Sequence, residues 1–340
     1  MYKSLQSLRY IFCLLVFLTH YSNGNIQPFT AGGNMGVAFF FILSGFVLSL
    51  AYGKKVDSED FSTWKFCLRF LKKVYPLHLL CTLYIILVNI EHMTWDDYSE
   101  IIPSLLLIQS WIPIETYYWG GNSISWFLSS LLFCYAMFPW LIRLFNKLSD
   151  KHLAIALILL LAVYAIAVAI SPENRMKDFV FINPLFRLVD FILGMATFRL
   201  LRHYYPSASS QTVNIIEFGC ILSIIATLAA YSCVSYKLRE TVLYWPSCIA
   251  MIVFFSTHEK KSPGILSSLL SKDWFAKLGN SSYEFYIIHH LVIITVVSQL
   301  TKRGFQINPI MLCICLMVLT TALSISLHKL LSPKKHQHIK

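Results

Sequence analysis

Charged residues are scarce in this sequence. Only 13% of its 340 residues are Asp, Glu, Lys or Arg, while 56% are hydrophobic. Soluble globular domains carry about 25% charged residues. This shortage excludes an ordinary soluble domain and predicts an all-α, polytopic integral membrane helix bundle.

Three further features are missing. The nine cysteines include no C-x-x-C pair and fall mostly within apolar runs, so neither a disulfide framework nor a metal site is indicated. Residues 1-25 lack an A-x-A-like cleavage site, and Arg9 interrupts the order of a signal peptide, so we expect no cleavage. No internal repeat is found, which weighs against the inverted repeats of many transporters.

Long apolar runs are what the sequence has instead. Ten of them can cross the roughly 30 Å hydrocarbon core of a membrane. The predicted spans are residues 5-21, 36-52, 75-90, 124-142, 152-170, 183-202, 213-234, 242-257, 282-300 and 308-331. The connecting segments are too short to fold alone. We therefore expect one transmembrane domain at 1-333, followed by a short basic cytoplasmic tail at 334-340.

Two other apolar segments are too short to span. Residues 103-111 are expected to be re-entrant or to lie along the outer membrane interface. Residues 262-278 combine apolar residues at near-helical spacing with Lys272 and Lys277. This pattern suits an interfacial helix on the cytoplasmic leaflet.

The basic residues predict the orientation. They gather after the even-numbered spans and are absent from 21-35 and 91-123. By the positive-inside rule, both termini are cytoplasmic. The net charge of +11 is explained by this topology, so membrane lipids are expected as partners and nucleic acid is not.

Arg9 and His20 stand out within the first predicted span. Eleven helical steps of about 100° place them on one face, about 16 Å apart along the axis. Ionisable groups inside a membrane usually face an interior cavity and mark function, and an imidazole can act as a general base near neutral pH. The alternative interpretation makes His20 an interfacial residue and Arg9 a snorkelling cytoplasmic anchor.

Two further sets of residues are candidates. Arg187 and Asp190 are spaced to pair across one helical turn, either as a structural pair or as part of the His20 cavity. Tyr283, Tyr286 and His289 occur at every third position of the ninth span, either as structural hydrogen-bonding residues or as substrate contacts. The adjacent residue, His290, is expected to face another direction.

Several sequence blocks resemble the acyltransferase family 3 membrane proteins, whose members move acyl groups, usually acetyl, onto sugars of surface glycans. In chain order, these blocks are Arg9 and His20 with ten residues between them, Gly36 to Phe46, Tyr75-Pro76-Leu77, Trp126 to Tyr135 with Pro139, Gly194, and Leu278 to His289. Trp126-Phe127-Leu128 is similar to one subgroup of the family. Leu131 stands where many relatives have Glu, so a mechanism that needs this carboxylate does not transfer.

The resemblance implies a membrane O-acetyltransferase of the bacterial inner membrane. Acetyl-CoA from the cytoplasm would be the co-substrate, no cofactor would be permanently bound, and the acceptor would be a hydroxyl of a surface polysaccharide or lipid-linked sugar. His20 is the implied catalytic base, and Arg9, the second catalytic residue, would hold the donor phosphates or neutralise charge partway along the donor path. The alternatives are a transporter or flippase of a lipid-linked sugar, using Arg9, Arg187 and Asp190, and a membrane scaffold whose polar residues are only structural.

The resemblance also suggests where the substrates bind. Arg69, Lys72 and Lys73 are expected to contact the acyl donor; Lys73 fits the second position of the family's R-x-x-R pair, whereas Phe70 occupies the first. The cluster could equally be a lipid-headgroup anchor, and Trp126 a belt aromatic at the membrane surface. The candidates for lining the substrate cavity are Ser44, Trp126, Arg187, Asp190, Tyr283, Tyr286 and His289.

Overall fold

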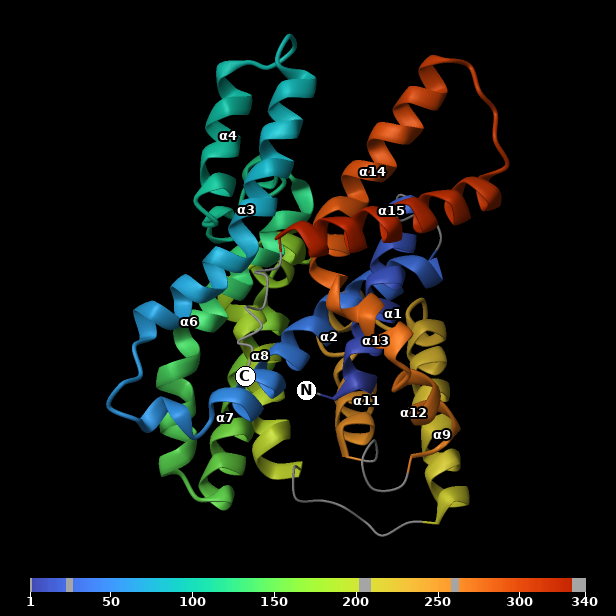
Figure 1. Ribbon diagram of the computed structural model, residues 1–340. Helices are drawn as coiled ribbons and strands as arrows, with labels where there is room; N and C mark the ends of the chain where they lie inside the picture. Colours follow the sequence, from blue (N-terminus) through green and yellow to red (C-terminus); the bar gives the residue numbers. More distant parts are fainter. Residues whose placement is uncertain (1, 23–26, 202–208, 258–262, 332–340) are drawn as a thin grey trace, which may run out of the picture.

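The computed structural model describes residues 2–22, 27–201, 209–257 and 263–331, and within these ranges it contains helices and no strand (Figure 1). The predicted spans coincide with helices α1 (Lys3–Tyr21), α2 (Gln27–Tyr52), α3 (Thr63–Asn89), α6 (Trp126–Lys147), α7 (Asp150–Ile170), α8 (Pro184–Leu201), α9 (Ser210–Ala230), α11 (Trp245–Thr257), α14 (Ser282–Lys302) and α15 (Pro309–Leu331). The shorter elements are η1 (Lys55–Asp57), α4 (Trp95–Leu105), η2 (Gln109–Trp111), α5 (Glu115–Tyr118), η3 (Ser123–Ser125), η4 (Glu173–Arg175), the π-helix η5 (Lys177–Phe181), α10 (Tyr236–Arg239), α12 (Ile265–Leu270) and α13 (Asp273–Asn280).

Seven helices in the described ranges are long and apolar enough to cross a membrane, which confirms the all-α polytopic membrane bundle. These seven correspond to α2, α3, α6, α7, α9, α14 and α15. Helices α1, α8 and α11 fall outside this set. Helix α8 carries Arg187, Asp190 and Arg199, and α11 has only 13 residues. Ten crossings and two cytoplasmic termini therefore stay predictions.

Helix α2 lies at the centre of the bundle. Within its most apolar stretch, 67% of the residues are buried, compared with 17% for α7, α9 and α15. Those three helices therefore present most of their apolar side chains outward, as membrane-facing helices do. Helix α1 packs beside α2 (Figure 1).

Glycines allow α2 and α8 to approach closely. A Cβ atom at Gly45 would lie 2.0 Å from the carbonyl oxygen of Phe191, and one at Gly194 would lie 1.9 Å from the carbonyl oxygen of Ile42. Neither position has room for a side chain. These small residues therefore let the backbones of α2 and α8 lie in contact.

Helix α3 begins well before the third predicted span, residues 75-90. Helix α3 begins at Thr63, where the Ser62 hydroxyl accepts a hydrogen bond from the backbone N–H of Lys65 at 3.3 Å and caps the helix. Arg69, Lys72 and Lys73, expected at the end of a loop, therefore lie within the helix. The apolar pattern could not show this, because the first three turns of α3 carry lysines and an arginine.

Regular helix is interrupted in each of the two short apolar segments. In 103–111, Leu107 adopts a positive φ of 54° and is buried together with Gln109 and Ser110, so part of this segment packs into the protein. The single interfacial helix expected at 262–278 is interrupted by extended backbone at Lys272, which separates α12 from α13.

All nine cysteines are free, and five of them are buried. The tail predicted at 334-340 lies outside the described residues.

Candidate functional site

A pocket lies among α1, α2, α3, α6 and α14. It has a volume of about 850 Å³, counting the space at its open side. Arg9, Ser44, Lys73 and Tyr283 contribute polar groups, while aromatic and aliphatic side chains form most of the remaining wall. The pocket thus combines positive charge with an apolar lining.

Arg9 is held in this pocket by the packing of α1. The hydroxyl of Ser4 donates to the carbonyl of Phe255 at 2.7 Å, and the hydroxyl of Ser7 donates to the carbonyl of Leu270 at 2.6 Å. Lys3 forms a 2.7 Å ion pair with Asp273, and its hydrogen bond and positive charge lower the pKa of that carboxyl. These contacts fix the first turns of α1 against α11, α12 and α13.

Arg9 and Lys73 are cations that no carboxylate neutralises directly. Within the described ranges neither forms an ion pair, and the buried Nε of Arg9 has no hydrogen-bond partner. Glu284 lies on α14, but its Oε1 is 2.9 Å from His328 Nδ1. Two unpaired cations in one pocket favour an anionic ligand.

The rest of the predicted donor-binding cluster lies elsewhere on α3. Arg69 and Lys72 are exposed and do not line the pocket. The guanidinium of Arg69 lies 6.0 Å from the ring centre of Tyr52, and its Nε donates to the carbonyl of Lys65 at 3.3 Å. Lys73 alone of the three joins Arg9.

A second cluster forms around His20, which does not line the pocket. Its Nδ1 lies 3.1 Å from His289 Nε2 and 3.0 Å from the carbonyl oxygen of Val16. His289 is fully buried, and its Nδ1 lies 2.5 Å from the carbonyl oxygen of Tyr286. The structure therefore brings His289, one of the three α14 residues predicted at every third position, into contact with His20, the predicted base on α1.

These contacts assign the protons of the neutral pair. His289 Nδ1 must donate to the Tyr286 carbonyl, so His289 Nε2 is an acceptor. His20 Nδ1 then carries the hydrogen that both Val16 and His289 accept. The remaining nitrogen of His20, Nε2, keeps a lone pair that can take a proton.

His290 also belongs to this cluster, contrary to expectation. Its ring centre lies 5.1 Å from that of His20, and its Nδ1 lies 3.0 Å from Ser123 Oγ. The preceding residue, Asn122, donates from Nδ2 to the carbonyl of Ile287 at 2.9 Å, and its buried Oδ1 has no partner. His289 and His290 are adjacent on α14 and so point in different directions. Their imidazole side chains are nevertheless long enough for both rings to lie close to that of His20.

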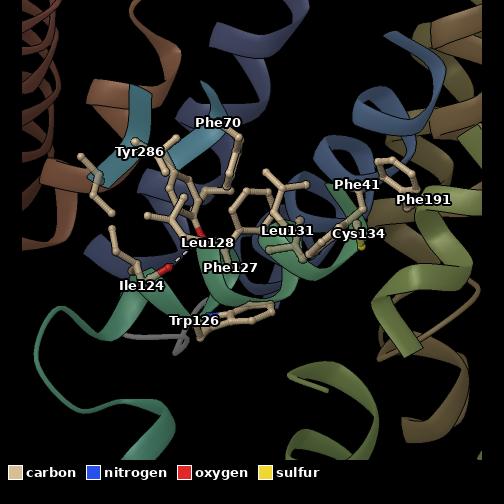
Figure 2. Close-up of a cluster of buried hydrophobic side chains, with 14 of the residues drawn as sticks. Phe41, Phe70, Ile124, Trp126, Phe127, Leu128, Leu131, Cys134, Phe191 and Tyr286 are labelled. Carbon is tan, nitrogen blue, oxygen red and sulfur yellow. Dashed lines mark hydrogen bonds between the residues drawn. The ribbon is translucent and has the colours of Figure 1, made fainter. Parts of the chain in front are cut away.

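Tyr283 and Tyr286, the other two of these α14 residues, line the pocket. The hydroxyl of Tyr283 donates to the carbonyl of Val74, and that of Tyr286 donates to the carbonyl of Ile124 at 3.3 Å (Figure 2). Their hydroxyl groups therefore hold α14 against α3 and η3. Ser44 is a further lining residue, and its hydroxyl donates to the carbonyl of Phe40 at 2.7 Å.

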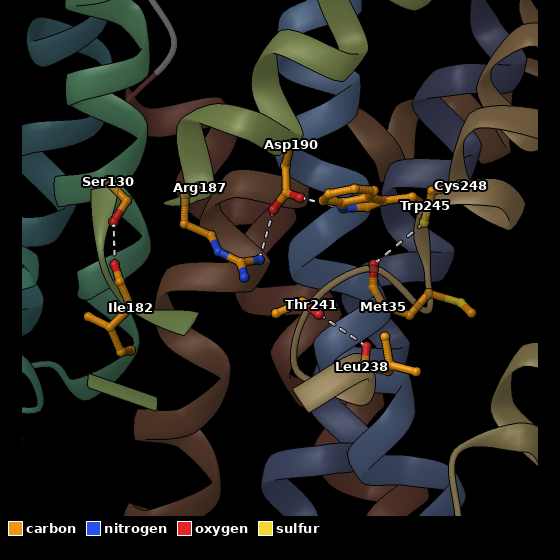
Figure 3. A network of polar contacts seen from close by, with 9 residues as sticks. All are labelled: Met35, Ser130, Ile182, Arg187, Asp190, Leu238, Thr241, Trp245 and Cys248. Atoms are coloured by element: carbon orange, nitrogen blue, oxygen red, sulfur yellow. Dashed lines mark hydrogen bonds and ion pairs between the residues drawn. The ribbon is translucent and has the colours of Figure 1, made fainter. Parts of the chain in front are cut away.

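Arg187 and Asp190 form a separate buried network (Figure 3). Their side chains pair at 2.8 Å, and Trp245 Nε1 donates to the second carboxylate oxygen at 2.5 Å. The guanidinium also lies 5.0 Å from the ring centre of Phe181. Neither charged residue lines the pocket that contains Arg9.

Trp126 is likewise outside the pocket lining. It is only 4% exposed, and its ring centre lies 5.3 Å from that of Phe181. A belt aromatic would expose its ring at the membrane surface, so Trp126 is better described as an interior packing residue.

Comparison with known proteins agrees with the sequence motifs. A family model described as an acyltransferase domain matches residues 2–329. The acyltransferase MdmB of Streptomyces mycarofaciens is 27% identical over 326 residues, covering 85% of this chain and 78% of that protein. The putative peptidoglycan O-acetyltransferase YrhL of Bacillus subtilis (strain 168) is 24% identical over 373 residues, covering 99% of this chain but only 57% of that protein.

No solved structure matches the chain significantly. The family match nevertheless covers nearly its whole length. The chain therefore belongs to the acyltransferase family 3 membrane proteins, the family that its motifs resemble.

Proposed function

We propose that this protein is an acetyl-CoA-dependent O-acetyltransferase of the bacterial inner membrane. It transfers an acetyl group from the cytoplasmic side to a hydroxyl of a surface polysaccharide or lipid-linked sugar. One observation carries this proposal: helix α1 carries both Arg9, which shares the partly apolar pocket with the unpaired Lys73 of α3, and His20, which contacts His289 of α14.

The donor end is formed by Arg9 and Lys73. Coenzyme A carries phosphate groups, which a guanidinium grips through two oxygens and an ammonium contacts as a point charge. Lys73 is exposed at the pocket, where it can meet a phosphate without leaving water. Arg69 and Lys72 precede it on α3 and would attract the remaining phosphate charge outside the pocket.

The reacting end is formed by His20 and His289. His20 Nε2 takes the proton of the acceptor hydroxyl while the oxygen attacks the thioester carbonyl carbon. A C–O bond forms, the C–S bond breaks, and the departing thiolate receives the proton from His20. His289 accepts the hydrogen bond from His20 Nδ1 and so fixes the orientation of the base.

The same residues also allow an acyl-enzyme route. In that route, His20 Nε2 attacks the thioester carbonyl carbon first and the C–S bond breaks to release the thiolate. The acceptor oxygen then attacks the acyl carbon, the C–N bond to His20 breaks, and the hydroxyl proton passes to the thiolate. Both routes need His20 with a free Nε2.

The relatives support this assignment. The name of YrhL describes it as a putative peptidoglycan O-acetyltransferase, which is a reaction of the proposed class. We extend the class to this chain and leave the identity of the sugar to experiment.

The test uses inverted membrane vesicles from native cells, with and without the gene, supplied with radiolabelled acetyl-CoA. We expect alkali-labile label in the glycan fraction only when the protein is present. NMR spectra of the surface glycan should lose an O-acetyl signal in the deletion strain. Movement of a lipid-linked sugar without acetyl-CoA, and with no labelled ester, would instead support a transporter.

A further inference from the structure

Each of three helices contributes one aromatic lining residue at the end of the pocket nearest the histidine pair. On α14, the lining residue nearest His289 is Tyr286. On α6, the corresponding lining residue is Phe127. It lies three residues after Ile124, whose carbonyl accepts the hydrogen bond from Tyr286. Helix α2 runs antiparallel to α1, because Gly33 approaches Thr19 while Phe39 stacks on Phe12. Its lining residue nearest His20 is therefore Phe40.

These three rings contact one another. The ring centres of Phe127 and Tyr286 are 5.1 Å apart, those of Phe40 and Phe127 are 6.2 Å apart, and those of Phe40 and Tyr286 are 6.3 Å apart. Separations of about 4.5–7 Å are typical of packed aromatic pairs. The three side chains thus close the end of the pocket.

The histidine pair lies on the other side of these rings. His289 is one helical turn beyond Tyr286 on α14, with 5.7 Å between their ring centres. Neither His20 nor His289 lines the pocket. When the donor phosphates are held at Arg9, the thioester at the other end of the donor must therefore pass the three rings before it reaches His20.

The three rings differ in how firmly they are held. Tyr286 is anchored by its hydroxyl, and Phe127 is buried with its ring centre 4.7 Å from that of Phe41 (Figure 2). Phe40 is only half-buried. Rotation of Phe40 consequently requires the least rearrangement of neighbouring side chains.

From this arrangement we infer that Phe40, Phe127 and Tyr286 form an aromatic gate that selects the acyl group by size. The inference rests on the proposed function. Rotation of Phe40 opens a passage for a short acyl thioester, and the fixed rings of Phe127 and Tyr286 exclude longer chains. The gate also keeps water in the pocket away from the thioester at His20.

The test compares acyl donors of increasing length. Vesicles from the deletion strain, complemented with wild-type or variant protein, are supplied with acetyl-, propionyl-, butyryl- or hexanoyl-CoA. Esters released from the glycan by mild alkali are quantified. We expect wild type to prefer acetyl, and Phe40→Ala to raise the butyryl-to-acetyl ratio at least about tenfold, because one methylene in a fitted site is worth about 10- to 200-fold in selectivity.

Two further variants make the result decisive. Phe40→Leu should give an intermediate butyryl-to-acetyl ratio. Phe39→Leu is the control: it removes a ring from the neighbouring position, which does not line the pocket, and it should keep the wild-type ratio. The proposal of an aromatic gate would be overturned if Phe40→Ala and Phe40→Leu both kept the wild-type ratio. It would also be overturned if both lost acetyl transfer while they remained folded. If wild-type protein transfers no acyl group from any donor, the proposed function itself fails.

Discussion

His20 Nδ1 lies 3.1 Å from His289 Nε2, so a residue near the start of the chain is oriented by one about 270 positions later. The hydrogen bond from His289 Nδ1 to the Tyr286 carbonyl makes its other nitrogen an acceptor. This contact leaves Nε2 of His20 as the proton-accepting atom. The proposed chemistry depends on that tautomer.

Replacing His289 should therefore reduce turnover through His20. We expect His289→Phe, which cannot accept the hydrogen bond, to lower kcat about 100-fold, within the range of general-base effects. His289→Gln retains an acceptor oxygen and should recover part of this loss. The KM for acetyl-CoA should change little. His92→Phe, at an exposed position, serves as the control; equal activity of His289→Phe and wild type would refute the orienting role.

Neutralising the pocket cations should weaken donor binding. Arg9→Gln and Lys73→Gln are each expected to raise the KM for acetyl-CoA about 10- to 100-fold, since a hydrogen bond to a charged group contributes about 1.5–3 kcal/mol. Lys147→Gln removes an exposed charge outside the pocket and should leave KM unchanged. Steady-state kinetics in vesicles measure both constants. A fall in kcat with no change in KM would contradict donor binding by these residues.

The Arg187–Asp190 pair should matter for stability. Asp190→Asn leaves a buried guanidinium without its counter-charge, and removing one partner of a buried pair costs about 3–5 kcal/mol in the free energy of unfolding. The double variant Arg187→Met with Asp190→Leu should recover much of this loss, because apolar replacements of a buried pair are often neutral. Unfolding in detergent measures the effect. If Asp190→Asn is as stable as wild type but does not bind substrate, the pair has a functional role instead.

The glycines between α2 and α8 give a second stability test. Gly45→Ala and Gly194→Ala each place a Cβ within 2.0 Å of a carbonyl oxygen, so the helices must separate and we expect a lower Tm. Gly219, within α9, has no atom within 4 Å of an added Cβ. Gly219→Ala should therefore be neutral or stabilise the protein by about 0.5–1 kcal/mol. A higher Tm for Gly45→Ala would show that the contact between these helices is not close.

Much of the helical architecture could be predicted because hydrocarbon requires long apolar runs with internally satisfied backbones. Helix ends were predicted less well. The early turns of α3 are basic and lie outside any apolar run, although Ser62 caps them. Similarly, the break at Lys272 comes from a change in backbone conformation that spacing alone does not reveal.

The candidate site was predictable within a helix but not between helices. Periodicity placed Arg9 with His20, and Tyr286 with His289, because residues on one helix have fixed angular relations. It could not show that His20 meets His289, that Lys73 alone joins Arg9, or that Arg187 and Asp190 lie apart from both. Asn122 and Ser123 had no recognisable pattern, because they lie before α6 and reach α14 only in the folded chain, where they contact Ile287 and His290.

The direct test of the central claim is the rate of acetyl transfer by His20→Ala. Inverted vesicles containing equal amounts of folded wild-type or variant protein receive radiolabelled acetyl-CoA, and alkali-labile label in the glycan is followed with time. Loss of the base should lower the rate about 10²- to 10⁴-fold while acetyl-CoA binding is retained. Transfer by His20→Ala at the wild-type rate would contradict the account.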